Sequence, residues 1–262
     1  MDLRLVARLT TAAPSRVVSQ IRINFSMVLN LLLSHSLEQI EDLLHRSFAA
    51  FLLEKRKSSK NRKNAFKSAH RYLWNDFIRH FNFLVRKGYV AEDGRLTPDG
   101  IWAAKLRIDQ PLLLAESFRL GILPESDPAL LAAVTAVFVN ERESDEHIPK
   151  NYIPRKLQQT FLNLKKSLAP FIRQMTARGF FVPPLFFRPA VSMHAWAFGF
   201  PWEKVLELAE CEEGDLAMQV LRTADNLRHI RALEQVFPRA AQTAGEAIEM
   251  ILREPVVMDY DL

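Results

Sequence analysis

Residues 212–230, EEGDLAMQVLRTADNLRHI, combine an apolar stripe with side chains that could hold a nucleic acid. At about 100° per residue, a helix over this segment places Leu216, Val220, Ala224 and Leu227 on one side. The opposite side holds an arginine, which suits phosphates and base edges, and short polar groups that form hydrogen bonds. An ordinary solvated helix is the alternative, because amphipathic surface helices are common. The polar residues expected on the outer side are Asp215, Gln219, Arg222, Asn226 and His229, with Met218 and Asp225 beside them.

Other chemistry has little support in the sequence. No G-x-x-x-x-G-K-[ST] segment is present, so the backbone loop that would cradle nucleotide phosphates is missing and no ATP site is expected in this chain. Asp145-Glu146-His147 resembles the acidic box of an ATPase, but that box follows a buried strand and the preceding NERES is polar. A solvated loop is therefore expected there.

Metal and nucleophilic chemistry are not expected either. The seven histidines and one cysteine show no ligand spacing, no H-E-x-x-H motif occurs, and His194 on an apolar helix is expected to be a core histidine. Cys211 lies between two acidic residues, which raise the pKa of its thiol and disfavour a nucleophile.

Composition indicates a globular protein with a sizeable core. Of the 262 residues, 48% are hydrophobic, and no apolar run approaches the ~20 residues needed to cross a bilayer. A single cysteine excludes an intrachain disulfide and fits a reducing cytoplasm, and the N-terminus lacks a secretory pattern. The net charge of +5 fits a polyanionic partner without requiring one.

The first part of the chain is expected to be helical with one hairpin. Apolar spacing predicts helices over 19–33, 37–53 and 65–87, the last ended by Gly88 as a left-handed cap. Asp93-Gly94 between short apolar runs predicts a tight hairpin with positive φ angles. Thr97-Pro98 then begins another helix. Three helices followed by a small hairpin suggest a winged-helix unit.

Beyond Asp109 the pattern is helical throughout and predicts a bundle. Gly121 ends one helix, Asp127-Pro128 begins another that runs to about residue 140, and further helices are expected over 154–178 and 238–253. The segment between the predicted helices 37–53 and 65–87 is basic and polar. Its residues 54–64, EKRKSSKNRKN, cannot bury apolar area and are expected to form a loop.

Two stretches resemble a known family. SQIRINFSMVLNLL (Ser19–Leu32), followed by LHRSF (Leu44–Phe48), is similar to the start of the winged-helix region in superkiller-like DExH-box helicases, just after their second RecA-like domain. The stretch Phe187–Ile230 resembles the DSHCT domain that ends those helicases, with its tryptophan, EGD turn and R-x-x-D-x-L-R helix. Residues 88–123 are similar to the family's wing and first bundle helices, so the resemblance covers nearly the whole chain.

The resemblance implies that residues 212–230 form the ratchet helix, which lies along the single strand as it leaves the motor. Arg222, Asp225 and Arg228 occupy the motif positions, while Leu221 and Met218 stand where relatives often have arginine. The neighbours Gln219, Asn226 and His229 complete the expected contact set. The basic segment replaces the long arch of exosome-associated relatives, and its cations either are solvated or contact phosphates: Lys55, Arg56, Lys57, Lys60, Arg62 and Lys63.

We therefore expect an all-α protein with a small β-hairpin wing followed by a helical bundle. The expected divisions are 1–14, a connector from a missing motor domain, 15–107, a winged-helix-like domain, and 108–262, a DSHCT-like bundle. The expected function is to guide single-stranded RNA, in preference to DNA, for an ATP-dependent helicase whose RecA-like motor domains hold ATP and Mg²⁺. The chain alone is not expected to be catalytic, to hold a cofactor or to bind a membrane. The alternatives are a winged-helix regulator that reads duplex DNA and a helical protein-interaction scaffold.

Overall fold

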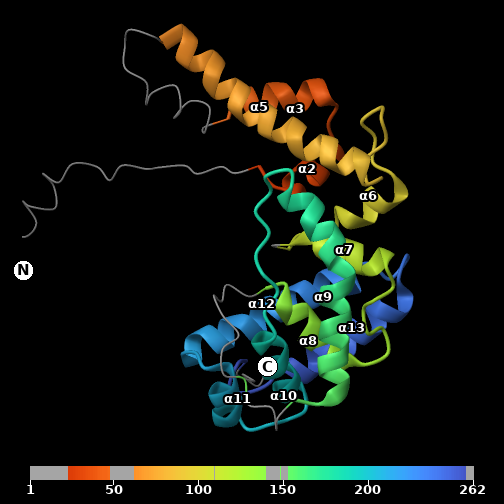
Figure 1. The fold of residues 1–262 in the computed structure, drawn as a ribbon, viewed down its shortest axis with the longest axis vertical. Coiled ribbons are helices and arrows are strands. Elements are labelled where there is room, and N and C mark those ends of the chain that lie inside the picture. The colour runs from red at the N-terminus through yellow and green to blue at the C-terminus, as the bar shows by residue number, and fades with distance from the viewer. Residues whose placement is uncertain (1–22, 48–61, 109, 140–147, 149–152, 258–262) are drawn as a thin grey trace, which may run out of the picture.

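The regular secondary structure of the described residues is helical except for one β-bridge (Figure 1). The structure is a computed structural model that describes residues 23–47, 62–108, 110–139, 148 and 153–257. For residues 62–71 it describes the backbone alone. None of the described helices has the length and hydropathy of a membrane-spanning segment. The described helices are α2 (Phe25–Leu32), α3 (Leu37–His45), α5 (Arg62–Arg86), α6 (Pro98–Ala103), α7 (Pro111–Arg119), α8 (Pro128–Val137), α9 (Arg155–Thr176), α10 (Arg188–Ala197), α11 (Trp202–Ala209), α12 (Glu213–Arg231) and α13 (Pro238–Ile251).

The first three helices form a small group in which α5 packs against α2 and α3. Asn24 caps α2 by accepting a 2.8 Å hydrogen bond from the Met27 amide, and Ser36 with Gln39 forms a capping box at the start of α3. The apolar side of α5 is buried through Leu73, Phe77 and Leu84. The exposed side of α5 carries Asn75, Arg79, Asn82 and Arg86.

The predicted C-terminal boundary of the basic loop is wrong. Arg62, Lys63 and Asn64 were expected to belong to the loop 54–64, yet they form the first turn of α5. Lysine and arginine have good helix propensity, so a run of positive charge does not by itself stop a helix. Residues 54–61, with Lys55, Arg56, Lys57 and Lys60, lie outside the described residues.

The predicted hairpin is reduced to one bridge between Val90 and Leu96. The Ala91 amide donates to the Arg95 carbonyl at 2.8 Å, and the Thr97 amide donates to the Tyr89 carbonyl at 3.1 Å. Gly94 has a φ of +86°, but among the described non-glycine residues only Glu210 has a positive φ, so the expected positive φ at Asp93 is wrong. The Asp93 side chain instead accepts a hydrogen bond from the Arg95 amide.

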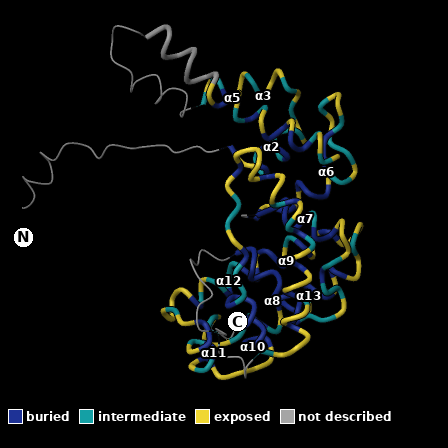
Figure 2. The backbone as a smooth tube through the Cα atoms, viewed as in Figure 1, coloured by how far each residue is buried: buried dark blue, intermediate teal, exposed yellow. Residues whose placement is uncertain are grey.

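The bundle is organised around α8, whose residues from Ala129 onward are all buried (Figure 2). Helices α9, α10, α12 and α13 all pack against it. Its start follows the predicted chemistry, because Pro128 is the first helical residue and the Asp127 side chain accepts a hydrogen bond from the Leu130 amide at 3.0 Å. The α8 sequence is apolar on every side, as expected for a helix that is surrounded by others.

Helix α9 connects the bundle with the first group of helices. It continues through Pro170 and ends before Gly179, whose φ of +73° lies in the left-handed region. Near this end, the ring centroids of Phe171 and Phe83 lie 5.8 Å apart, and those of Phe180 and Phe25 lie 4.8 Å apart. The buried residues of both parts therefore form one continuous core.

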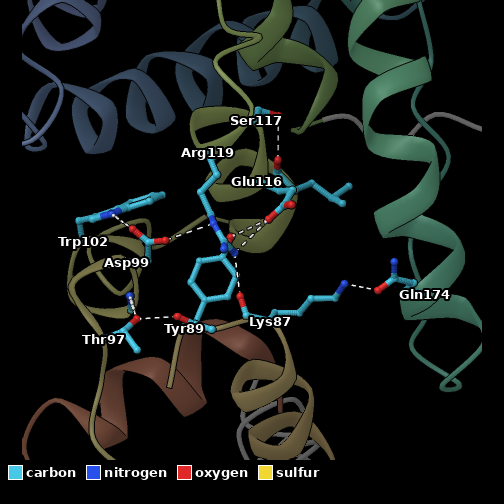
Figure 3. A network of polar contacts seen from close by, with 12 residues as sticks. Lys87, Tyr89, Thr97, Asp99, Trp102, Glu116, Ser117, Arg119 and Gln174 are labelled. Carbon is cyan, nitrogen blue, oxygen red and sulfur yellow. Dashed lines mark hydrogen bonds and ion pairs between the residues drawn. The ribbon is translucent and has the colours of Figure 1, made fainter. Parts of the chain in front are cut away.

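A polar network also joins the two parts (Figure 3). The Arg119 guanidinium donates to the Lys87 carbonyl at 2.8 Å, lies 3.2 Å from the Asp99 carboxylate and 3.4 Å from the Glu116 carboxylate, and its central carbon lies 4.8 Å from the Tyr89 ring centroid. The Tyr89 hydroxyl donates to Glu116 at 3.2 Å. Burial raises the pKa of Tyr89, so the phenol stays protonated as a donor. One arginine thus links the ends of α5, α6 and α7.

Replacement of Arg119 by methionine is expected to destabilise the fold by about 1–3 kcal/mol, because two carboxylates and a backbone carbonyl lose a charged donor. Urea unfolding monitored by circular dichroism measures this loss. Arg95→Met is the matched control, since the Arg95 side chain is 88% exposed and pairs with Asp93 at 3.7 Å. Equal unfolding midpoints for both variants would contradict the role given to Arg119.

Candidate nucleic-acid interface

Helix α12 has the two-sided character that the sequence predicts. Leu216, Val220, Ala224, Leu227 and Ile230 are all fully buried. They pack toward α13, α8 and α11, so the backbone of α12 is held from one side. Its orientation is therefore fixed, and the polar residues fall into three different environments.

Asp225 and Arg228 lie on the open part of α12 and pair with each other. Their side chains are 63% and 52% exposed, and the Arg228 guanidinium donates to the Asp225 carboxylate one turn earlier. Such exposed pairs add only about 0–1 kcal/mol to stability, so this pair is available for rearrangement by a ligand. Because each charge offsets the other, the pair contributes little net positive potential.

Asn226 is not on the outer side, and its predicted placement there is wrong. It is 7% exposed and lies between the buried Thr223 and Ile230 on the helix surface. At about 100° per residue it stands roughly 100° from the centre of the apolar stripe, at the border that the neighbouring helices cover. An asparagine in this position cannot contact a strand without movement of the bundle.

The N-terminal half of α12 borders a pocket of about 760 Å³ that it shares with α10 and α11. Asp215, Met218, Gln219 and Arg222 line it from α12. The Gln219 amide nitrogen is buried and has no hydrogen-bond partner within the described part of the chain. The remaining polar lining is mostly acidic, from Glu207, Glu210 and Glu212.

This charge distribution divides the predicted contact surface. Two of the four carboxylates are paired with cations outside the lining, Glu207 with Lys204 and Glu210 with Arg188. Glu212 and Asp215 still outnumber the one arginine of the lining, which disfavours a phosphate inside the pocket because like charges repel. Arg222 stands at the boundary between the acidic pocket and the open C-terminal half of α12. Phosphate contact is thus disfavoured inside the pocket, before Arg222.

His229 lies beside the segment that links the two parts of the protein. Burial lowers the pKa of its imidazole, the Arg107 guanidinium lowers it further, and Asp225 and the Lys105 backbone act in the opposite direction. The ring is therefore neutral at pH 7 and offers hydrogen bonds but no charge to a phosphate.

The other predicted residues do not add a second site here. Arg62 and Lys63 belong to the first turn of α5, and nothing in the structure brings them to α12. His194 is 8% exposed and stacks on Phe198 with ring centroids 4.6 Å apart, which confirms its expected core position. Across the described ranges, no three histidine, cysteine or carboxylate side chains gather in a way that could hold a metal ion.

Comparisons with known proteins match most of the chain. A family model described as the DSHCT (NUC185) domain matches residues 93–259. The DExH-box ATP-dependent RNA helicase DExH15, chloroplastic, from Arabidopsis thaliana is 28% identical over 189 residues, which are 70% of this chain and 16% of that protein. The chain thus spans about a sixth of the length of this relative.

Proposed function

The chain belongs to the DSHCT (NUC185) domain family, and on this basis we propose that it is the strand-guiding C-terminal part of an ATP-dependent helicase. Its partners would be RecA-like motor domains, which supply ATP hydrolysis with Mg²⁺, and a single strand of RNA. The match to a relative that is named as an RNA helicase supports RNA over DNA. The absence of a phosphate-binding loop from the sequence supports a guiding role in place of a catalytic one.

The proposed division of the chain is a winged-helix-like unit over 15–107 and a bundle over 108–262. Helices α2, α3 and α5, followed by the Val90–Leu96 bridge and α6, support the first unit. The continuous core and the Arg119 network support a rigid connection between the two units. A guide for a moving strand needs such rigidity, because it must hold its position while the motor domains open and close.

The observation that carries the proposal is the exposed C-terminal half of α12 on a buried apolar base. Arg222 would contact phosphate, and Asp225 and Arg228 would open their ion pair to hydrogen-bond the strand. Contacts of this kind retain a strand against backward movement during each motor cycle. In single-strand binders, each base that stacks on a protein contributes about 1–3 kcal/mol.

Replacement of Arg222 by alanine is expected to weaken binding of a fluorescein-labelled 12-nucleotide RNA by about 3–10-fold, as for loss of one charged phosphate contact. Fluorescence anisotropy at 50 mM KCl measures the Kd. Arg239→Ala is the control, because Arg239 is exposed on α13 outside this face. The proposal predicts that a duplex of the same sequence binds more weakly than the single strand. Tighter binding to the duplex, or an equal loss in both variants, would contradict it.

A further inference from the structure

Helix α9 is strongly basic and contains no acidic residue. From Arg155 to Arg178 the sequence contains six basic residues and no acidic one, whereas the whole chain has a net charge of only +5. The rest of the protein therefore carries no net positive charge. An ordinary solvated helix mixes both signs and forms pairs one turn apart, and α9 has no acidic partner of its own.

Three of the cations of α9 lie along one line on its outer side. At about 100° per residue, Arg155, Lys166 and Arg173 fall within roughly 20° of each other. All three are exposed, and the buried residues of α9, such as Leu164 and Leu168, lie on the opposite side. With a rise of about 1.5 Å per residue, the line is ~27 Å long. Apart from Lys156 and Lys165, the exposed polar residues between these cations are neutral: Gln158, Gln159 and Asn163.

These three charges are not neutralised by the described protein. Lys156 at one edge pairs with Asp127 at 2.7 Å, and the Lys165 ammonium lies 5.7 Å from the Phe161 ring centroid. For Arg155, Lys166 and Arg173, the described residues provide no ion pair. A row of cations without an ion pair among the described residues, separated by amide side chains, can bind the phosphates of a nucleic-acid backbone. Arginine, lysine and amide side chains all donate hydrogen bonds to phosphate oxygens.

We propose that the outer side of α9, through Arg155, Lys165, Lys166 and Arg173, is a second nucleic-acid surface that binds the phosphate backbone of RNA without reading its sequence. The proposal rests on the proposed function in its choice of RNA as the polyanion. It places the main electrostatic attraction on α9, whereas the acidic pocket beside α12 contributes repulsion. The α9 surface would hold RNA outside the guided strand, and α12 would contact the strand itself.

An acidic protein segment is the competing occupant. Lys165 and Arg173 also border an apolar hollow of about 570 Å³ between α9 and residues 182–186, which could take an apolar side chain of such a segment. Arg155 and Lys166 do not line this hollow. A ligand that uses the whole line of cations must therefore extend past the hollow, which favours a continuous backbone.

The test compares two triple charge reversals in the full chain. Arg155→Glu/Lys166→Glu/Arg173→Glu is expected to weaken binding of a labelled 20-nucleotide RNA at least 10-fold at 50 mM KCl. Loss of about three phosphate contacts should also reduce the slope of log Kd against log [KCl] by ~2. The control Arg46→Glu/Arg95→Glu/Arg239→Glu changes the net charge equally at exposed positions on other elements, and its Kd is expected to stay within about twofold. A milder variant with glutamine at the three α9 positions should weaken binding in the same direction if the reversal misfolds.

Three results would overturn the proposal. One is an unchanged Kd in the α9 variants, and another is an equal loss in the control. The third is displacement of the RNA by poly-L-glutamate at matched charge with equal potency, which would assign the face to acidic protein segments. Arg222→Ala separates this proposal from the function of α12. If it weakens RNA binding while the α9 reversal does not, the α9 surface is excluded and the guiding role of α12 stands.

Discussion

Gly100→Ala is expected to destabilise the protein by about 3 kcal/mol or more, although it adds a single methyl group. A Cβ atom on Gly100 would lie 1.9 Å from the Tyr89 carbonyl oxygen and 3.1 Å from the Leu96 side chain. That oxygen already accepts the hydrogen bond from the Thr97 amide beside the Val90–Leu96 bridge. The methyl group can be accommodated only if α6 separates from this bridge, which would also disturb the Arg119 network.

Urea unfolding of Gly100→Ala beside Gly214→Ala tests this close approach. Gly214 lies in the first turn of α12, and a Cβ there meets nothing within 4 Å. Alanine at Gly214 should therefore stabilise the fold by about 0.5–1 kcal/mol, because it restricts the unfolded chain and favours the helix. The two substitutions are expected to shift the unfolding midpoint in opposite directions. A shift of the same sign and size in both would show that the contact between Gly100 and Tyr89 is not limiting.

Helix ends could be predicted where the deciding interaction is local. Thr97 accepts a hydrogen bond from the Gly100 amide at 3.2 Å, and Asp127 caps α8, as their positions before proline indicate. Gly88 and Gly121 have φ angles of +74° and +61°, which confirms both as helix-ending residues. Each of these outcomes depends on a few neighbouring residues and needs no knowledge of the tertiary fold.

The turn between Val90 and Leu96 could be predicted only in outline, because its form depends on distant contacts. The runs beside Asp93-Gly94 allow a hairpin, but α6 begins at Pro98 and leaves room for a single bridge. The turn packs on the first group of helices, with Leu37 and Phe81 within 4 Å of the Cβ position of Gly94. That packing sets the turn geometry, so the geometry cannot be predicted from the turn preferences of the local residues.

The candidate site was predicted in part for a similar reason. Periodicity identifies the buried side of α12, but it cannot show which helices cover the edges of that side. Asn226 and Gln219 stand at such an edge, and only the fold shows that Asn226 is buried. Two of the four carboxylates that line the pocket near Arg222, Glu207 and Glu210, lie upstream of α12 in sequence. A helical wheel drawn for one helix cannot include them.

Arg188 is a structural residue that the sequence did not reveal. An arginine at the first position of a helix, before proline, is ordinarily solvated, yet Arg188 is 1% exposed. Its guanidinium donates to the Leu208 carbonyl at 3.1 Å and lies 2.9 Å from the Glu210 carboxylate. Glu210 has a φ of +47° and ends α11 two residues before the N-cap of α12. Arg188 thereby fixes the connection from which α12 begins.

Arg188→Met is expected to cost about 3–5 kcal/mol of unfolding free energy, because it removes one partner of a buried ion pair and leaves the Leu208 carbonyl without this donor. Arg188→Lys should recover only part of the loss, since an ammonium cannot reach a carbonyl and a carboxylate in two directions as a planar guanidinium does. Glu210→Gln should cost less, about 1–2 kcal/mol, because water replaces part of the interaction of a side chain that is 50% exposed.

A double-mutant cycle of Arg188→Met and Glu210→Gln, measured by urea unfolding, separates the energy of the Arg188–Glu210 ion pair from the effect of packing a methionine at position 188. With both residues replaced, the loss is expected to be smaller than the sum of the single losses by about 1–3 kcal/mol, as for directly contacting charges. Strict additivity would mean that Arg188 stabilises the fold through contacts other than Glu210. Because the same arginine fixes the start of α12, Arg188→Met should also weaken RNA binding, while Arg222→Ala should leave stability almost unchanged. Measurements of stability and of RNA binding therefore separate the residues that position α12 from Arg222, which we propose contacts the strand.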